Sequence, residues 1–323
     1  MTKVDLKRAL EQMLNGEMST DDIVDVLISL ENEGVGSDEL AVGVDVMRAN
    51  MNRIDVPERA IDIVGTGGTG LKTLSISTAT AIVVAAAGTP VAKHGNRGAS
   101  SPTGTADVLS KLGVNIAMSP ERAAQAVSDV GMGFLFAPTY HPAMRHVGPA
   151  RKQIKGRTLF NRLGPLCNPG EVKYMLVGCA ERHLVKPMAD ALSSYVKRAI
   201  VVRGHDGLDE ITTTGPSDIC EVSPEGSSLK TMTLSDWAAP PAQAKDLVGG
   251  APDYNAKRLK QLLEGQKDAY RDIVLLNARE ALWIAGQDKQ FTSKSDAAMA
   301  AQESIDSGKA KTLLKNLAEF SHG

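Results

Sequence analysis

A glycine-rich run at residues 62–70 constrains the fold of this chain more than any other stretch of its sequence. The run reads Asp-Ile-Val-Gly-Thr-Gly-Gly-Thr-Gly, overlaps the apolar segment 61–64, and leads to Ser-Ile-Ser-Thr at 75–78, where an apolar helix opens. Glycines let the backbone approach a ligand and turn its N–H groups toward it, and the N-terminus of the next helix adds a positive dipole. The sequence therefore predicts a strand, a phosphate-binding loop and a helix in succession.

Two common nucleotide-binding patterns do not fit this run. Three of its glycines match the dinucleotide fingerprint, but that site needs an acidic residue about 20 residues further on, where this chain has Lys-His-Gly-Asn-Arg at 93–97. A Walker A loop needs an adjacent glycine and lysine, whereas Leu71 separates Gly70 from Lys72. The run is therefore expected to bind the phosphates of another kind of ligand.

A second polar loop follows the next predicted strand, at 90–92. Its cationic and polar side chains are Lys93, His94, Asn96, Arg97, Ser100, Ser101, Thr103 and Thr105. In open α/β sheets, ligands bind beyond the carboxyl ends of the strands, so the two loops are expected to face one crevice. Two such loops favour a ligand that carries several phosphates.

Short apolar runs separated by helical patterns predict the fold class. The runs lie at 61–64, 90–92, 133–136, 175–179 and 199–202. Such alternation is typical of an α/β fold, in which a mainly parallel sheet carries helices on both faces.

Amphipathic patterns before and after these strands predict the domain organisation. Three patterns precede the first strand and predict a small helical domain at 1–60, to which a basic, turn-rich segment near 152–168 is expected to return. The larger α/β domain then comprises 61–151 and 169–323. Within it, the patterns at 273–283 and 297–317 predict closing helices.

The charge balance and the cysteines limit the ligands and the compartment. With 36 basic against 38 acidic residues the net charge is -2, and only 4% of the residues are aromatic. Such a chain lacks the basic surface and the stacking side chains that nucleic-acid binding requires. Its three widely spaced cysteines suit a reducing compartment, and residues 1–14 contain no apolar run typical of a signal or a membrane span. We expect a cytoplasmic protein without nucleic-acid or membrane partners.

Two adjacent carboxylates, Asp209 and Glu210, follow the strand predicted at 199–202, at the same end of the sheet as the glycine-rich run. Mg²⁺ prefers hard oxygen ligands and commonly takes one or two carboxylates together with substrate phosphates. The pair therefore predicts a Mg²⁺ site.

Six motifs occur in order along the chain. They are Gly-Thr-Gly-Gly at 65–68, Ser-Thr at 77–78, Lys-His-Gly-Asn-Arg at 93–97, His-Pro-Ala-Met-Arg at 141–145, Arg-Thr-Leu-Phe-Asn-Arg-Leu-Gly-Pro-Leu-Cys-Asn-Pro at 157–169 and Asp-Glu at 209–210. Together they resemble the motifs of the anthranilate phosphoribosyltransferase family, whose fold is nucleoside phosphorylase-like. The resemblance covers nearly the whole chain.

The resemblance implies a glycosyltransferase that moves the 5-phosphoribosyl group of phosphoribosyl pyrophosphate (PRPP) to the amine of anthranilate. This is the second step of tryptophan biosynthesis, and the family pattern implies Mg²⁺ and a homodimer formed through the N-terminal helices. No general base is assigned, because the aromatic amine is already neutral at pH 7.

The resemblance also implies a role for individual residues. Those implied to contact PRPP are Gly65, Gly68, Thr69, Thr73, Ser75, Ile76, Ser77, Thr78, Lys93, His94, Gly95, Asn96, Arg97, Gly98, Ala99, Ser100, Ser101 and Thr105. Those implied to contact anthranilate are Gly65, His94, Asn96, Arg151 and Pro165. Those implied to hold the metal are Ser77, Asp209 and Glu210.

Two positions in the donor loop depart from the family pattern. Thr69 stands where the family commonly has aspartate, and Ser75 stands where it commonly has asparagine. Serine keeps a hydrogen-bonding group but has a shorter reach. Two alternatives stay open at this point: a nucleoside phosphorylase-like enzyme that uses inorganic phosphate, and a non-catalytic relative that binds nucleic acid.

Overall fold

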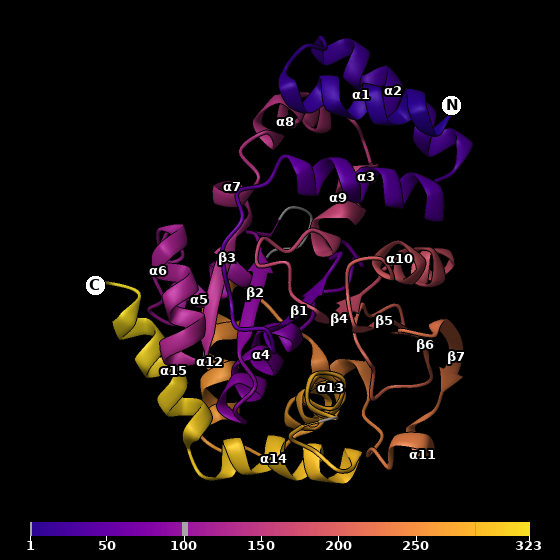
Figure 1. Cartoon of the computed structure of the whole chain (residues 1–323). Coiled ribbons are helices and arrows are strands. Elements are labelled where there is room, and N and C mark those ends of the chain that lie inside the picture. Colours follow the sequence, from indigo (N-terminus) through magenta and orange to yellow (C-terminus); the bar gives the residue numbers. More distant parts are fainter. Residues whose placement is uncertain (1, 99–102, 288) are drawn as a thin grey trace.

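A seven-stranded sheet forms the centre of the protein, which is described by a computed structural model over residues 2–98, 103–287 and 289–323 (Figure 1). Its strands are β1 (Ile61–Gly65), β2 (Val91–Gly95), β3 (Met132–Phe136), β4 (Tyr174–Gly178), β5 (Arg198–Gly204), β6 (Ser217–Ser223) and β7 (Gly226–Met232). Their order is β3-β2-β1-β4-β5-β6-β7. The strands from β3 to β5 are parallel, and β6 and β7 are antiparallel to their neighbours. The mainly parallel α/β class predicted from the sequence is confirmed.

Helices cover both faces of the sheet and extend beyond one of its edges. They are α1 (Lys3–Asn15), α2 (Thr20–Glu33), α3 (Ser37–Ala49), α4 (Ile76–Ala86), α5 (Thr105–Lys111), α6 (Pro120–Gln125), α7 (Ala137–Tyr140), α8 (Met144–Gln153), α9 (Leu159–Leu163), α10 (Val185–Leu192), α11 (Leu234–Trp237), α12 (Pro252–Leu263), α13 (Ala269–Gly286), α14 (Lys294–Asp306) and α15 (Lys309–Phe320). Within the described residues, none of them combines the length and the apolar composition needed to cross a membrane.

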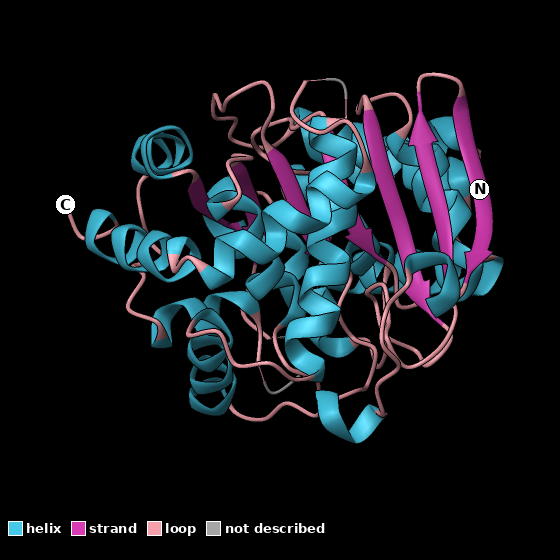
Figure 2. Ribbon diagram, turned by 90° about the horizontal axis from the view of Figure 1, so that it is seen from below, coloured by secondary structure: helices cyan, strands magenta, loops and turns pink. Residues whose placement is uncertain are grey.

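The crossover connections decide which face each helix covers. The chain moves one way along the sheet from β1 through α4 to β2, and the opposite way from β4 through α10 to β5. Because such crossovers are right-handed, α4 and α10 lie on opposite faces. α4 and α13 pack on the parallel strands, and Figure 2 shows helices lying across one face with the strands behind them.

Burial explains why the strands and α4 have apolar sequences throughout. β4 is buried at all five of its residues, as a strand covered on both faces should be. Residues 78–85 of α4 are likewise all buried, because this helix lies between the sheet and the helices α13, α14 and α15. A helix enclosed in this way lacks the polar stripe of a surface helix.

The N-terminal helices form a layer beyond the carboxyl edge of the parallel strands (Figure 1). α8 contacts α1 and α2, and α9 contacts α2 and α3. Leu163 of α9 is fully buried, and its side chain lies so close to Gly43 of α3 that a Cβ there would come within 2.7 Å. The segment near 152–168 therefore packs on the N-terminal helices and then returns to the sheet.

Two strands and one helix break were not predicted from the sequence. β6 and β7 form a hairpin, and most residues of β7 are exposed. An edge strand has little to bury, so Gly-Ser-Ser-Leu-Lys-Thr-Met carries no apolar run. The helix predicted at 297–317 is wrong in one respect: it is two helices, α14 and α15, separated at Gly308, whose φ of +78° interrupts the helical backbone.

Candidate active site

Three loops meet at the carboxyl edge of the sheet, after β1, β2 and β5. The strand order reverses between β1 and β4, and ligands of doubly wound sheets bind at such a switch point. The backbone N–H of Gly67 donates a hydrogen bond of 2.9 Å to Oδ2 of Asp209. The loops after β1 and β5 are therefore in contact at the expected ligand position.

The glycine-rich loop has the backbone geometry of an anion site. Gly67, Gly68 and Gly70 have φ values of 61°, 69° and 77°, which favour glycine. α4 begins at Ile76, after the intervening residues 71–75, and the Ser75 side chain does not cap it. Two of its first N–H groups are already bonded: that of Ile76 to the carbonyl of Leu74 at 2.9 Å, and that of Ser77 to the Glu210 carboxylate.

Asn277 of α13 holds the loop that carries the two carboxylates. Its Oδ1 accepts from the N–H of Ile211 at 3.0 Å, and its Nδ2 donates to the carbonyl of the same residue at 2.8 Å. Burial raises the pKa of Asp209, and burial together with the charge of Asp209 raises the pKa of Glu210 to about 8. Two partly buried carboxylates that repel each other favour a cation between them.

The donor set at this edge fits Mg²⁺. Asp209 and Glu210 supply hard oxygen atoms, and the loop contains no sulfur ligand. Within the described part of the chain, no group of three histidine, cysteine or acidic side chains could enclose a metal ion. Two carboxylates leave coordination positions for water and phosphate oxygens, which is the usual arrangement for Mg²⁺.

Lys93 lies inside the sheet layer, where its ammonium donates to the carbonyl of Ile63. Burial lowers its pKa, an effect that the charges of Asp62, Glu210 and Asp209 oppose. The resemblance implies that Lys93 contacts PRPP, and in the structure its charge also acts on the acidic pair.

Asp62 and Asn168 are buried polar residues that the sequence did not identify as part of the site. Oδ1 of Asp62 accepts from the N–H of His94 at 3.1 Å, and its Oδ2 accepts from Nδ2 of Asn168 at 2.8 Å. Burial raises the pKa of Asp62 to about 6, against the opposing charge of Lys93. These bonds fix the end of β2 against β1. The only available signal was an acidic residue in an otherwise apolar strand.

Two buried histidines lie next to each other below the helical layer. The ring centroids of His94 and His141 are 5.1 Å apart, and Nδ1 of His94 lies 3.1 Å from the carbonyl oxygen of Gly164, the neighbour of Pro165. Among the described residues, Nε2 of His94 and both ring nitrogens of His141 have no hydrogen-bond partner. The sequence grouped His94 with Pro165, and the structure brings these residues together. It adds His141, whose motif was recognised without assigning it a role.

Arg151 of α8 is partly buried, and its side chain makes no hydrogen bond or ion pair with any residue that the structure describes. Burial lowers the pKa of its guanidinium. Arg97, by contrast, is paired with Asp107 at 2.9 Å, and Oδ1 of Asn96 accepts from the N–H of Arg97 at 2.8 Å. Arg151 is therefore the better placed of the two arginines to receive an anionic group.

The other predicted donor residues gather around the starts of α4 and α5. Asn255 of α12 bonds both the carbonyl of Thr73 and Oγ of Ser75 at 3.2 Å. Oγ1 of Thr78 donates to Oγ1 of Thr105 at 3.4 Å, which joins the two helix starts. The positions not yet mentioned are Ile76 and Ser77 in α4, Gly65 and Gly95 at the ends of their strands, and Thr69 and Gly98 in the two loops. Ala99, Ser100 and Ser101 lie outside the described residues.

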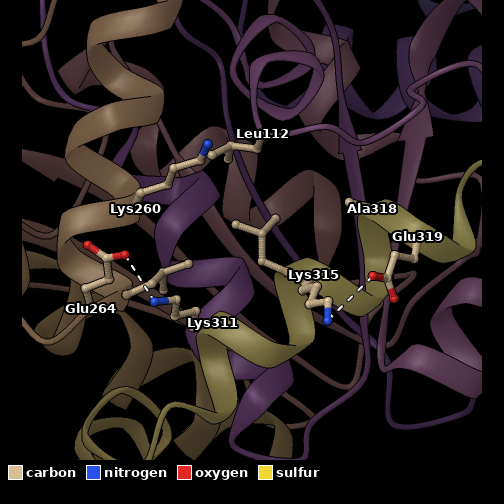
Figure 3. Close-up of a pocket in the computed structure, with 9 residues that line it drawn as sticks. Leu112, Lys260, Glu264, Lys311, Lys315, Ala318 and Glu319 are labelled. Atoms are coloured by element: carbon tan, nitrogen blue, oxygen red, sulfur yellow. Dashed lines mark hydrogen bonds and ion pairs between the residues drawn. The ribbon is translucent and has the colours of Figure 1, made fainter.

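A separate surface hollow of about 370 Å³ lies between α12, α15 and the end of α5 (Figure 3). Its Lys311 pairs with Glu264 at 3.1 Å, and its Lys315 pairs with Glu319 at 3.7 Å. Two of the three lysines that line the hollow are thus paired with carboxylates within it, the third being Lys260. It lies away from the carboxyl edge and does not contribute to the site.

The position of the loop that carries Asp209 and Glu210 depends on a glycine in β4. A Cβ at Gly178 would lie 1.8 Å from the backbone oxygen of Asp209, so Gly178→Ala must displace this loop. We expect the substitution to weaken Mg²⁺ binding about tenfold or more, because ligand position controls affinity. Calorimetric titration of Mg²⁺ in the presence of pyrophosphate measures this. Gly215→Ala is the control, since it meets no atom within 4 Å. Unchanged Mg²⁺ affinity in Gly178→Ala would contradict the metal assignment.

The buried histidines make stability depend on pH. Burial lowers the pKa of His94 to about 3 and that of His141 to about 4. Below the unfolded value of about 6.5, the unfolded chain binds protons that the folded chain does not, so stability falls as the pH decreases. Between pH 6.5 and 5 we expect each histidine to contribute about 2 kcal/mol of this loss. Urea unfolding at several pH values should give a smaller loss for His141→Gln, while the exposed control His183→Gln should match the wild type.

Comparison with known proteins agrees with this geometry. The glycosyl transferase family, a/b domain, matches residues 57–311. Anthranilate phosphoribosyltransferase of Parvibaculum lavamentivorans is 47% identical over 320 residues, covering 98% of this chain and 92% of the relative. The crystal structure of anthranilate phosphoribosyltransferase from Thermus thermophilus has a TM-score of 0.92 and 35% identity, covering 100% of this chain and 96% of that one.

A more distant solved structure shows the same fold. Anthranilate phosphoribosyltransferase from Saccharomyces cerevisiae, in complex with PRPP and Mg, has a TM-score of 0.89 at 24% identity over 99% of this chain and 93% of that chain. The family match, the identity to the bacterial relatives and the shared fold lead to one conclusion: the chain belongs to the anthranilate phosphoribosyltransferase family.

Proposed function

We propose that this chain transfers the 5-phosphoribosyl group of PRPP to the amine of anthranilate, releasing pyrophosphate, in the second step of tryptophan biosynthesis. It is a phosphoribosyltransferase of the glycosyl transferase family, as its relatives are. The observation that carries the proposal is the contact between the glycine-rich loop and Asp209, which combines an anion site with a cation site. A nucleoside phosphorylase or a nucleic-acid-binding relative gains no specific support from the site.

The pyrophosphate end of the donor is assigned to the glycine-rich loop. Its left-handed glycines give the backbone conformation of an anion-binding loop, and the start of α4 adds a positive dipole. Ser77 and Thr78, in the first turn of α4, add hydroxyl groups. The loop after β2 supplies the remaining contacts.

Mg²⁺ is assigned to Asp209 and Glu210, with Ser77 beside them. When bound, the ion would neutralise the departing pyrophosphate and fix its orientation. The chain's own contribution is to hold the two carboxylates in place through Asn277. Lys93, beneath the pair, offsets part of their charge.

Anthranilate is assigned to the side of the crevice that faces α8. The unpaired guanidinium of Arg151 suits the carboxylate, since its planar fork can bind both oxygens. His94, His141 and Pro165 provide a closely packed wall, and Asn96 lies at the end of β2. The low pKa values of His94 and His141 keep both rings neutral near pH 7, so neither repels Arg151.

The transfer forms the bond from the amine nitrogen to the anomeric carbon and breaks the bond from that carbon to pyrophosphate. The amine loses one proton, which the released pyrophosphate or water can accept. Because the nucleophile is neutral before attack, holding the two substrates together can supply much of the rate without a strong base.

Three further properties are part of the proposal. We infer a helical domain at 1–60 with the returning segment near 152–168, and an α/β domain formed by the rest. We also infer a homodimer formed through the N-terminal helices and a cytoplasmic location. Val4 and Ile28 are exposed on α1 and α2 and suit a dimer contact, whereas Met13, Met47 and Met51 are buried in the core.

The reaction can be followed by the loss of anthranilate fluorescence. Purified protein with PRPP and Mg²⁺ should consume anthranilate, and omission of the metal should stop this. Asp209→Ala combined with Glu210→Ala should reduce turnover about 100-fold or more, since the carboxylates would no longer hold the ion. Full activity in this double variant would remove the metal assignment. No consumption by the wild type, with PRPP binding intact, would remove anthranilate as the acceptor.

The Arg151 assignment predicts a selective loss. Arg151→Ala should raise the KM for anthranilate about tenfold or more, because a paired guanidinium and carboxylate would be lost, while the KM for PRPP should change little. Lys152→Ala is the control, since Lys152 is an exposed neighbour on the same helix. Steady-state kinetics measure both constants. Equal losses for the two substrates would contradict the assignment.

A further inference from the structure

Linked ion pairs connect the N-terminal helices to the glycine-rich loop. Arg162 of α9 donates from Nη1 to Glu31 of α2 at 2.6 Å, and from Nε and Nη2 to both oxygens of Glu181 at 2.8 Å. Glu181 also accepts from Nη1 of Arg157 at 3.2 Å. Nη2 of Arg157 then donates to the carbonyl oxygen of Gly67. We call Glu31, Arg162, Glu181 and Arg157 the loop relay.

The relay is sufficiently buried to fix its own geometry. The Arg162 side chain is 6% exposed and that of Glu181 is 20% exposed. Burial raises the pKa of Glu181, but the hydrogen bonds and the charge of Arg162 outweigh this and keep the pKa below its usual value. A two-pronged contact between guanidinium and carboxylate sets both distance and orientation. Arg162 therefore fixes the Glu181 carboxylate in the position from which it accepts from Arg157.

Arg157 in turn fixes one peptide group of the glycine-rich loop. The carbonyl of Gly67 accepts from Arg157, while the N–H of Gly67 donates to Asp209 at 2.9 Å. Peptide groups are planar, so fixing the carbonyl of Gly67 also fixes the direction of the N–H of Gly68. A Cβ at Gly68 would lie 2.4 Å from Nη2 of Arg157, so the guanidinium packs directly on the loop.

We propose that the loop relay positions the glycine-rich loop for the pyrophosphate group of the donor. Its four members act as positioning residues, and Glu31 on α2 affects donor affinity without touching the donor. This inference rests on the proposed function, because it takes PRPP as the ligand of the loop.

The chain offers a matched control for Glu31. Glu171 lies between α9 and β4, and it pairs with Arg48 of α3 at 2.8 Å. This pair also joins the N-terminal helices to the sheet region. Within the described residues, Glu171 forms no hydrogen bond or ion pair with the loop relay or with the glycine-rich loop. Glu31→Gln and Glu171→Gln therefore each remove one charge from a similar link, but only the first weakens the relay.

Calorimetric titration of pyrophosphate with Mg²⁺ tests the relay without requiring turnover. Glu31→Gln should weaken pyrophosphate binding about threefold, and Arg157→Gln about tenfold, since each loosens a charged hydrogen-bond network. Glu171→Gln should bind as the wild type does. The double variant Glu31→Gln with Arg157→Gln should bind no more weakly than Arg157→Gln alone, because Glu31 acts through Arg157.

Three results would overturn the proposal. Equal weakening by Glu31→Gln and Glu171→Gln would mean that loss of any link to the N-terminal helices has the same effect. Effects of Glu31→Gln and Arg157→Gln that multiply in the double variant would mean that the residues act independently. Restored binding in Arg157→Lys would mean that a positive charge near the pyrophosphate suffices, because lysine cannot bridge Glu181 and Gly67 as the planar guanidinium of arginine does. If anthranilate is not consumed but these affinities behave as expected, the reaction assignment fails and the relay stands.

Discussion

The hydrogen bond from the Gly67 N–H to the Asp209 carboxylate is the contact on which the site depends, because it joins the glycine-rich loop to the loop that carries Asp209 and Glu210. It requires close approach of two backbones. Glycine is needed at position 178, where a side chain would strike the Asp209 backbone, and at position 65, where a Cβ would lie 2.5 Å from the Asp209 carboxylate. The glycines at 65 and 178 therefore allow the contact between the two loops.

The electrostatics of this contact favour joint binding of metal and donor. Burial and mutual repulsion raise the pKa of Glu210, and Lys93 in the layer below offsets only part of this effect. A cation relieves the repulsion, and pyrophosphate then supplies the oxygens that two carboxylates leave unfilled. Neither ligand alone satisfies every group at the edge of the sheet. Metal and donor should thus each increase the affinity for the other.

Features that are local in sequence could be predicted, whereas those that depend on distant contacts could not. The glycine-rich run predicts the strand, loop and helix that β1, residues 66–75 and α4 form. Continuous apolar runs identify the five parallel strands, because burial on both faces leaves that signal. β7 was not predicted because an exposed edge strand has no continuous apolar run. Asp62, His141 and the arginines at 157 and 162 gain their roles from partners as many as 131 residues away, which no spacing reveals.

The segment that carries α8 and α9 is connected both to the assigned acceptor position and to the glycine-rich loop. Arg151 on α8 faces the assigned acceptor position, while Arg157 and Arg162 connect Glu31 with the donor loop. Both helices pack on the N-terminal helices. A movement of the helical layer would therefore shift the acceptor groups and the support of the glycine-rich loop together. One movement of the helical layer can therefore adjust the positions of both substrates, although no residue of α1, α2 or α3 is assigned to contact either of them.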